Sequence, residues 1–410
     1  MALMDTKLRD SIDWVGYVDW SMRDFHSYQT DRGVTYNAYL VRDDKTALID
    51  TVKAPFADGL LANVAALTSL DKVDYVVCNH AEPDHAGSLA KVLKALPNAT
   101  LVCAAKAVPT LARYHDTSGW RTRTVATGEE IRLGRRTLRF IETPLVHWPE
   151  SMFTYIPEDR LLFSMDAFGQ HYASSQRFDD QNPLCFLMEE AKAYYANIIM
   201  PYGRQVAATL EKVAGLEIDM IAPSHGVIWR GHARDIVGCY QNWVQSRPRP
   251  KVLVLYDSMW ENTGQMAAAI HEGASQPGVE AKLIHIRRSN LTRIASEVLD
   301  AAAIAVGSST LNQGMMPMMG AVLTYLKGLR PANKVGVAFG AYGWTKGGPE
   351  SVEAAMKNMK WELVREMIAV PYCPDPQTLA DCRGAGVKLA EHALRVAAGR
   401  RAGENLCVDP

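Results

Sequence analysis

The last third of the chain alternates short apolar runs with segments of helical length. Three runs have the length and the unbroken hydrophobicity of buried strands: 252–256, 301–306 and 334–339. A helix-compatible stretch follows each run, the first beginning near Thr263 and the last near Pro349. Strands that alternate with helices at this spacing predict parallel βαβ units in a doubly wound sheet. Such sheets bind ligands beyond the carboxyl ends of their strands, where the intervening loops lie.

The first 245 residues show a different pattern, in which several apolar runs follow one another in hairpin order. The predicted strands are Thr35–Leu40, Thr46–Asp50, Tyr75–Cys78, Arg136–Glu142, Met152–Ile156 and Leu161–Ser164. Helices are predicted at 86–96, 105–114, 186–199 and 205–214. Strands mixed with intervening helices are typical of an α+β or layered sandwich domain.

A proline-containing segment, Ser246-Arg-Pro-Arg-Pro-Lys251, separates the two patterns. Two prolines in alternation fit neither a helix nor a central strand, so we expect an extended linker here. The sequence therefore predicts two domains, residues 1–246 and residues 251–398.

The composition is that of a globular chain, with 48% hydrophobic residues, 22% charged residues and a formal net charge of −1. This charge balance gives no bulk attraction to nucleic acid or to an anionic membrane, and neither is expected as a partner. No stretch approaches the roughly 18 uninterrupted apolar residues of a membrane-spanning helix. The cysteines form no CxxC pair, which argues against cysteine-ligated zinc or iron. We expect a cytoplasmic protein.

The densest candidate chemistry is the segment His80-Ala-Glu82-Pro-Asp84-His85, which lies between a predicted strand and a predicted helix. Potential metal ligands at a strand end can face a common centre without placing charge inside the sheet. A solvated turn with an acidic helix start is a sufficient explanation for Asp84 alone. It does not explain the set, because two histidines and two carboxylates rarely cluster without a metal.

Three further candidate ligands, His147, Asp166 and His225, each follow a predicted strand or a short apolar run. Taken singly, each is better explained as a capping or packing residue. Together with the first cluster they indicate a metal site. Imidazoles and carboxylates in these numbers would serve two divalent ions with a bridging carboxylate, and this ligand chemistry suits iron in both of its redox states.

The His80–His85 motif and its spacing to the later ligands resemble the metallo-β-lactamase superfamily. Hydrolytic members have a second histidine where this chain has Glu82. That glutamate, with a flavodoxin-like segment downstream, resembles the flavodiiron proteins (A-type flavoproteins, which include oxygen and nitric oxide reductases). The resemblance spans nearly the whole chain and includes Tyr36–Tyr39, His147–Met152 and Asp166–His171. It implies an N-terminal metallo-β-lactamase-like αββα sandwich followed by a flavodoxin-like doubly wound parallel sheet.

The resemblance also implies the ligand set of two non-haem irons. One iron would be bound by His80, Glu82 and His147, the other by Asp84, His85 and His225, with Asp166 bridging them. By the same resemblance, His26, His171 and Tyr195 would line the gas pocket and donate a hydrogen bond or a proton. A purely structural role is an equal alternative for each of these three residues.

A second candidate site lies in the loops of the doubly wound domain. The segment Ser258–Thr263 opens its first helix, and hydroxyls with free N–H groups at a helix N-terminus form a cradle for a monophosphate. A dinucleotide is not indicated, because G-x-G-x-x-G is absent. With the two later loops we predict FMN, and the candidate contacts are Ser258, Met259, Trp260, Glu261, Asn262, Thr263, Ser309, Thr310, Leu311, Asn312, Ala341, Tyr342, Gly343 and Trp344. The chain departs from the family at Ser309 and at Thr345–Gly348, so Lys346 is expected near the flavin.

The implied activity is reduction of dioxygen to water, of nitric oxide to nitrous oxide, or of both. The resemblance further implies a head-to-tail homodimer or a dimer of dimers. Because no CxxC pair follows Leu389, a separate rubredoxin or flavin reductase is expected as the electron donor. Two alternatives stay open: a binuclear zinc hydrolase with an appended flavodoxin domain, which Glu82 weakens, and an electron carrier that uses only the FMN domain.

Overall fold

The structure is a computed structural model that describes residues 6–398. The chain divides into two compact units, the first ending at Gln241 and the second beginning at Asn242. Within residues 6–398, none of the helices combines the length and the apolar character needed to cross a membrane.

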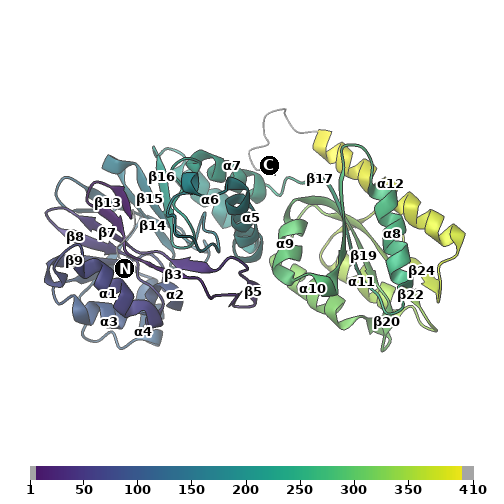
Figure 1. Cartoon of the computed structure of the whole chain (residues 1–410), viewed down its shortest axis with the longest axis horizontal. Helices are drawn as coiled ribbons and strands as arrows, with labels where there is room; N and C mark the ends of the chain where they lie inside the picture. Colours follow the sequence, from purple (N-terminus) through teal and green to yellow (C-terminus); the bar gives the residue numbers. More distant parts are fainter. Residues whose placement is uncertain (1–5, 399–410) are drawn as a thin grey trace. The chain divides into compact units, whose positions relative to one another are not determined.

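Two sheets pack face to face in the first unit (Figure 1). The order of the larger sheet is β1 (Lys7–Arg9), β2 (Ile12–Trp14), β7 (Tyr39–Arg42), β8 (Thr46–Ile49), β9 (Val73–Cys78), β10 (Thr100–Ala104) and β11 (Thr122–Val125). The order of the smaller sheet is β12 (Glu130–Arg132), β13 (Thr137–Glu142), β14 (Met152–Ile156), β15 (Leu161–Met165) and β16 (Met220–Pro223). Two small hairpins stand beside them, β3 (Tyr17–Asp19) with β6 (Val34–Tyr36), and β4 (Asp24–Phe25) with β5 (Tyr28–Gln29).

Helices cover the outer faces of this pair of sheets. Alternate residues such as Val41 and Phe140 fill the core between the sheets, while Leu48 on the opposite face of the larger sheet packs in one cluster with Leu60 and Val92. The covering helices on that side are α1 (Ala57–Ala65), α3 (Leu89–Ala95) and α4 (Ala107–Tyr114). Figure 1 shows α5 (Leu184–Tyr194), α6 (Gly203–Val213) and α7 (Ala233–Val244) along the smaller sheet. The predicted αββα sandwich is confirmed.

One predicted strand, Thr35–Leu40, is in fact two, β6 and β7. The chain breaks at Asn37, whose backbone N–H donates to the Ser224 carbonyl at 2.8 Å. Its side-chain amide donates to the carbonyls of Pro223 and Gly226 at 2.8 and 3.0 Å. These three hydrogen bonds hold the loop after β16. Asn37 therefore bonds to that loop and interrupts the strand.

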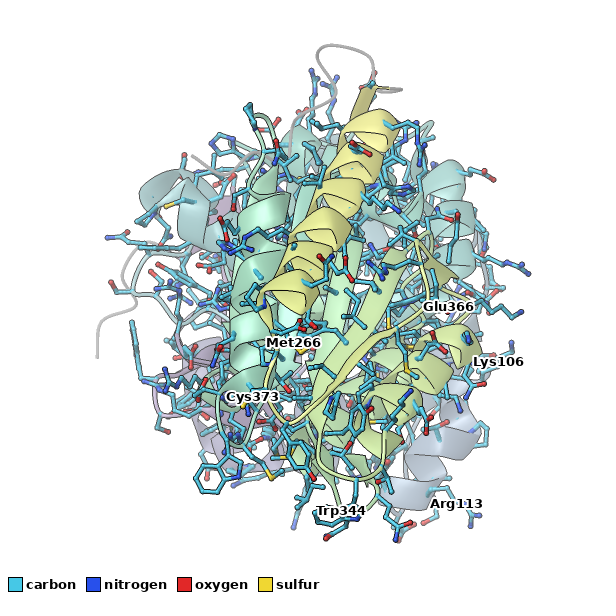
Figure 2. All side chains as sticks on the ribbon, turned by 90° about the vertical axis from the view of Figure 1, so that its right-hand side faces the viewer. Lys106, Arg113, Met266, Trp344, Glu366 and Cys373 are labelled. Carbon is cyan, nitrogen blue, oxygen red and sulfur yellow. The ribbon has the colours of Figure 1, made fainter. Side chains whose placement is uncertain are left out.

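The second unit is a parallel sheet with helices on both faces. Its order is β18 (Glu280–His285), β17 (Arg249–Asp257), β19 (Ala301–Ser308), β22 (Val335–Tyr342) and β23 (Glu362–Leu363), and β24 (Ile368–Pro371) also pairs with β22. One face carries α8 (Asn262–Ala274) and α12 (Pro376–Ala398), which Figure 2 shows side by side. The other face carries α9 (Leu291–Asp300), α10 (Pro317–Leu329) and α11 (Gly347–Asn358) (Figure 1). The predicted doubly wound sheet is confirmed.

The prediction of a linker up to Lys251 is wrong in its second half, because β17 already begins at Arg249. Arg249 pairs with Ala301, and the register with β19 then shifts before Val252. Pro250 thus lies at an irregularity near the start of the strand, where a missing N–H is tolerated.

Candidate functional sites

The seven candidate metal ligands lie at the ends of strands from both sheets of the first unit. His80, Glu82, Asp84 and His85 follow β9 of the larger sheet, and the short helix α2 (Pro83–Ala86) carries the last two. His147, Asp166 and His225 follow β13, β15 and β16 of the smaller sheet. These three strands run in the same direction, so their carboxyl ends share one edge.

The first group of ligands comprises His80, Glu82, His147 and Asp166. The Nε2 atoms of His80 and His147 lie 3.1 and 3.2 Å from Glu82 Oε2. Asp166 Oδ2 is 3.1 Å from His147 Nε2 and 3.5 Å from His80 Nε2. One donor atom from each of the four residues therefore faces a common point.

The second group comprises Asp84, His85 and His225. The Nε2 atoms of both histidines lie 3.2 Å from Asp84 Oδ2. The other oxygen of Asp166, Oδ1, is 3.2 Å from His85 Nε2 and 3.5 Å from His225 Nε2. The carboxylate of Asp166 thus turns one oxygen to each group, which is the geometry of a bridging ligand.

The donor atoms in these groups fit metal cations. Asp84 Oδ1, Asp166 Oδ2 and both ring nitrogens of His85 are buried without a hydrogen-bond partner among residues 6–398. Burial lowers the pKa of His85, but the carboxylates of Asp84 and Asp166 outweigh it and raise this pKa to about 9. Buried acceptors that draw positive charge so strongly are the electrostatic counterpart of a cation site, and imidazole with carboxylate suits iron or zinc.

Three residues that were not among the candidate ligands hold the ligands in place. The Thr35 carbonyl lies 2.6 Å from His225 Nδ1, and since a carbonyl only accepts, Nδ1 donates and Nε2 keeps its lone pair. Ser224 Oγ donates to Asp166 Oδ1 at 2.8 Å, and Glu150 Oε1 lies 2.9 Å from His80 Nδ1. Ser224 and Glu150 stand next to a ligand or within its motif, which is a usable sequence signal. Nothing in the sequence singles out Thr35.

The three residues that were predicted to line the gas pocket, His26, His171 and Tyr195, lie in three different environments. His171 is buried with its ring centroid 5.6 Å from that of His225, and burial lowers its pKa to about 3, so the ring is neutral. His26 lies at the tip of the β4–β5 hairpin, exposed, with Nε2 3.8 Å from Glu82 Oε1. Tyr195 packs on Tyr240, with ring centroids 5.0 Å apart.

The tyrosine that lies against His171 and the candidate ligand His225 is Tyr194. Its ring centroid is 4.8 Å from that of His171 and 6.0 Å from that of His225. Successive residues of a helix point about 100° apart, so only one of two adjacent tyrosines can face the site. α5 ends at Tyr194. Sequence motifs do not show which of its side chains point toward the site.

Gly226 supplies a test of how tightly the loop that carries His225 is held. Its φ is +81°, and a Cβ there would overlap the side-chain oxygen of Gln170 and lie 2.6 Å from its backbone oxygen. Gly226→Ala should lower the free energy of unfolding by about 2 to 4 kcal/mol, from backbone strain plus overpacking. Urea unfolding with metal analysis measures this. Gly215→Ala, with nothing within 4 Å of its Cβ, is the matched control, and an equal effect of both variants would contradict the prediction.

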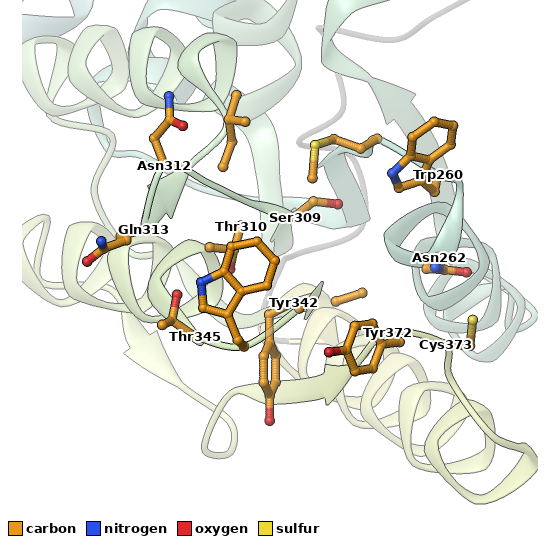
Figure 3. Close-up of a pocket in the computed structure, with 15 residues that line it drawn as sticks. Trp260, Asn262, Ser309, Thr310, Asn312, Gln313, Tyr342, Thr345, Tyr372 and Cys373 are labelled. Atoms are coloured by element: carbon orange, nitrogen blue, oxygen red, sulfur yellow. The ribbon is translucent and has the colours of Figure 1, made fainter.

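A cavity of about 650 Å³ opens in the second unit at the carboxyl ends of its strands (Figure 3). Its lining comes from the last two residues of β22 and from the segments that follow β17, β19, β22 and β24. The lining residues are Met259, Trp260, Asn262, Ser309, Thr310, Leu311, Asn312, Gln313, Ala341, Tyr342, Gly343, Trp344, Thr345, Tyr372 and Cys373. Figure 3 shows Trp260 and Asn262 on one side of the cavity, with Asn312 and Gln313 on the other. Most of the predicted FMN contacts are therefore brought together around one hollow.

A hydroxyl buried behind the cavity, that of Thr263, joins three of the loops. Thr263 Oγ1 lies 2.9 Å from Ser309 Oγ and accepts from the Ala341 N–H at 3.1 Å. Ser258 Oγ is buried without a partner among the described residues, close to the start of α8. An unpaired hydroxyl near a helix N-terminus fits the phosphate of a mononucleotide.

The remaining predicted contacts lie behind or beside the cavity. Ser258, Glu261 and Thr263 do not line it; they belong to the turn that leads into α8. Four lining residues were not predicted: Gln313, Thr345, Tyr372 and Cys373. Lys346 is exposed, with Nζ 5.9 Å from the ring centroid of Tyr342. Trp260 and Trp344 are more than four-fifths exposed, at 83% and 88%.

Two family models match the chain, one in each unit. Residues 34–226 match the model described as ODP family beta lactamase. Residues 254–386 match the flavodoxin model.

Curated relatives match over almost the whole chain. The nitric oxide reductase of Moorella thermoacetica is 43% identical over 93% of this chain and 97% of that protein. The anaerobic nitric oxide reductase flavorubredoxin of Pectobacterium atrosepticum is 39% identical over 94% of this chain and 77% of that protein.

Solved structures superimpose equally broadly. The flavodiiron protein from Giardia intestinalis has a TM-score of 0.94 and 37% identity, and the match covers 97% of this chain and 98% of that one. The rubredoxin oxygen:oxidoreductase from Desulfovibrio gigas has a TM-score of 0.92 and 36% identity over 96% of this chain and 100% of that one.

Proposed function

The chain belongs to the flavodiiron protein family of oxidoreductases, and on that premise we propose that it reduces dioxygen to water, nitric oxide to nitrous oxide, or both. The observation that carries the proposal is the pair of ligand groups that share Asp166. Two adjacent redox-active metal ions would supply electrons to a bound diatomic gas, and one carboxylate between two histidine-containing groups provides adjacent positions for them.

The proposed metal ligands are the seven residues predicted from the sequence. One iron would be held by His80, Glu82 and His147, and the other by Asp84, His85 and His225, with Asp166 between them. Glu82 supports iron over zinc, because an added carboxylate favours the harder ion. The diiron domain is proposed to span residues 1–246 and the FMN domain residues 251–398.

The FMN is proposed to occupy the cavity of the second unit. Ser258 and the first N–H groups of α8 would hold its phosphate, and the loops after β19 and β22 would hold its ring. When bound, one FMN and two irons together store four electrons, the number that reduces dioxygen to water.

The pocket residues beside the His225 side of the metal site supply polarity without net charge. His171 stays neutral at physiological pH, and its Nε2 has no hydrogen-bond partner among the described residues. It is therefore available to hydrogen-bond a small polar guest. The ring of Phe25 lies 5.2 Å from that of His171 and 5.9 Å from that of His225, and it shields this side from water. Tyr194 adds a phenol to the same wall, and His26 is proposed as a polar group at the exposed rim.

Electrons are proposed to arrive from a separate protein, a rubredoxin or a flavin reductase. The name of the Desulfovibrio gigas relative supports a rubredoxin as the donor. We further propose a head-to-tail homodimer or a dimer of dimers, in which the FMN of one chain serves the irons of the next.

The decisive experiment combines metal analysis with gas consumption. The purified chain should contain about two irons and about one FMN, and after anaerobic reduction it should consume dioxygen or nitric oxide. A strong chelator should abolish nitric oxide consumption and the reduction of dioxygen to water, and it should leave the flavin absorbance unchanged, because the irons and the FMN have separate ligands. Added Fe(II) should restore activity, whereas Zn(II), which has no redox chemistry, should not. Zinc without iron in the purified chain, or nitric oxide consumption or water formation that survives chelation, would reject the proposal.

A further inference from the structure

Glu150 is a buried carboxylate that points at a metal ligand from behind. It lies in the loop between β13 and β14, three residues after His147, and is 3% exposed. Its Oε1 accepts from the Ala81 backbone N–H at 3.1 Å and lies 2.9 Å from His80 Nδ1. Because that oxygen is an acceptor, the Nδ1 of His80 is the donor.

This hydrogen bond fixes both the tautomer and the direction of the His80 ring. With the proton on Nδ1, the lone pair of Nε2 points to the first ligand group, where Glu82 Oε2 is 3.1 Å away and Asp166 Oδ2 is 3.5 Å away. A carboxylate on the far nitrogen also makes the imidazole a stronger electron donor toward a metal.

The other three ligand histidines have no such support among residues 6–398. His225 Nδ1 donates to the backbone carbonyl of Thr35, which is uncharged. His85 Nδ1 is buried without a partner. The ion pairs of His147 with Glu82 and Asp166 are both made through Nε2. The two metal positions are therefore unequal, and among residues 6–398 only the first has a carboxylate hydrogen-bonded to the far nitrogen of a ligand histidine.

We propose that Glu150 is a positioning residue for the first metal position, acting through His80 to strengthen the binding of that ion. The inference rests on the proposed function, since it takes the two ligand groups as a dinuclear site. Its charge is the active property: the negative carboxylate polarises the ring of His80, whose Nε2 faces the first ligand group.

Two variants separate charge from shape. Glu150→Gln keeps the length of the side chain but removes the charge, and Glu150→Asp keeps the charge but shortens the reach. For Glu150→Gln we expect the ion in the first position to be lost to a chelator about 10 to 100 times more readily than in the unmodified chain. Glu150→Asp should retain that ion better than Glu150→Gln does. If Glu150 only filled space, Glu150→Gln, which keeps the length of the side chain, would retain the ion better than Glu150→Asp.

The readout is metal retention during chelator competition, with Mössbauer spectra of the iron-loaded protein to resolve the two positions. Only one of the two iron signals should change in Glu150→Gln, and the FMN content should stay constant as a check on folding. Asp179→Asn is the matched control, because Asp179 is also buried in this unit and accepts from the backbone N–H groups of Arg230, Gly231 and His232. Asp179 contacts no side chain of the proposed metal ligands, so the Asp179→Asn variant should retain metal as well as the unmodified chain does.

The inference is overturned if Glu150→Gln retains metal as well as Asp179→Asn does, or if both iron signals change together. Competition is run with Fe(II) and with Zn(II), so the result does not depend on which metal the chain carries when purified. A chain that binds only zinc would reject the proposed function and still decide the role of Glu150.

Discussion

Replacing Asp166 with asparagine should abolish gas reduction and lower the iron content from about two ions per chain to one or fewer. Asp166 turns Oδ1 to His85 and Oδ2 to His147, at 3.2 and 3.1 Å. An asparagine offers an oxygen to one group only, and its amide N–H groups would face the lone pairs of the other. It also removes a negative charge from a buried site that has to balance two cations.

The loss of activity in Asp166→Asn should exceed the roughly 10- to 100-fold loss that is typical when a residue beyond the metal ligands is replaced. Iron analysis and steady-state consumption of dioxygen and nitric oxide measure it. FMN content should be unaffected, because the flavin cavity lies in the second unit. Asp180→Asn is the control: Asp180 pairs with Arg230 at 2.9 Å on a partly exposed surface of the same unit and touches none of the ligands. An Asp166→Asn variant with two irons and full activity would show that Asp166 does not bridge.

Replacing Thr263 with valine should weaken FMN binding by at least about tenfold. Because the FMN is proposed to pass electrons to the irons, the variant should also reduce gas more slowly. The valine has the same shape but leaves Ser309 Oγ and the buried Ala341 N–H without the bonds that join α8 to the next two loops. An unsatisfied buried polar group costs about 1 to 3 kcal/mol, and a tenfold change in affinity corresponds to about 1.4 kcal/mol.

Fluorescence titration of the flavin-free protein with FMN measures this change. Thr263→Ser keeps the hydroxyl and should bind FMN nearly as well as the unmodified chain, whereas iron content should be normal in both variants. Equal FMN affinity of the valine and serine variants would show that this hydroxyl does not organise the cavity.

Much of the candidate metal site was predictable because each proposed ligand follows a strand. A strand end is visible as the end of an apolar run, and the carboxyl ends of neighbouring strands that run in the same direction meet at one edge. Local reasoning therefore identified His147, Asp166 and His225 without knowledge of the topology. The division of Asp166 between two groups was suggested by family resemblance, and the structure supplies the distances that support it.

The residues that the sequence did not reveal depend on helix phase or on contacts between distant segments. Tyr194 and Tyr195 differ by one position, and only the three-dimensional course of α5 shows which of them faces His171. Thr35 acts through its carbonyl, so its side chain carries no signal for that contact. Tyr372 and Cys373 reach the flavin cavity from the end of β24, a short strand that the apolar pattern did not suggest.

Each metal group draws its ligands from both sheets of the first unit. In the first group, His80 and Glu82 follow a strand of the larger sheet and His147 follows a strand of the smaller one. In the second group, Asp84 and His85 come from the larger sheet and His225 from the smaller. Ions held by these proposed ligands would therefore cross-link the two layers, in addition to the hydrogen bonds that already join them at this edge, such as that from the Ala81 N–H to Glu150. Binding free energy at such a site is also folding free energy. On the proposed function, removal of the ions would then lower the free energy of unfolding of the first unit as well as the activity.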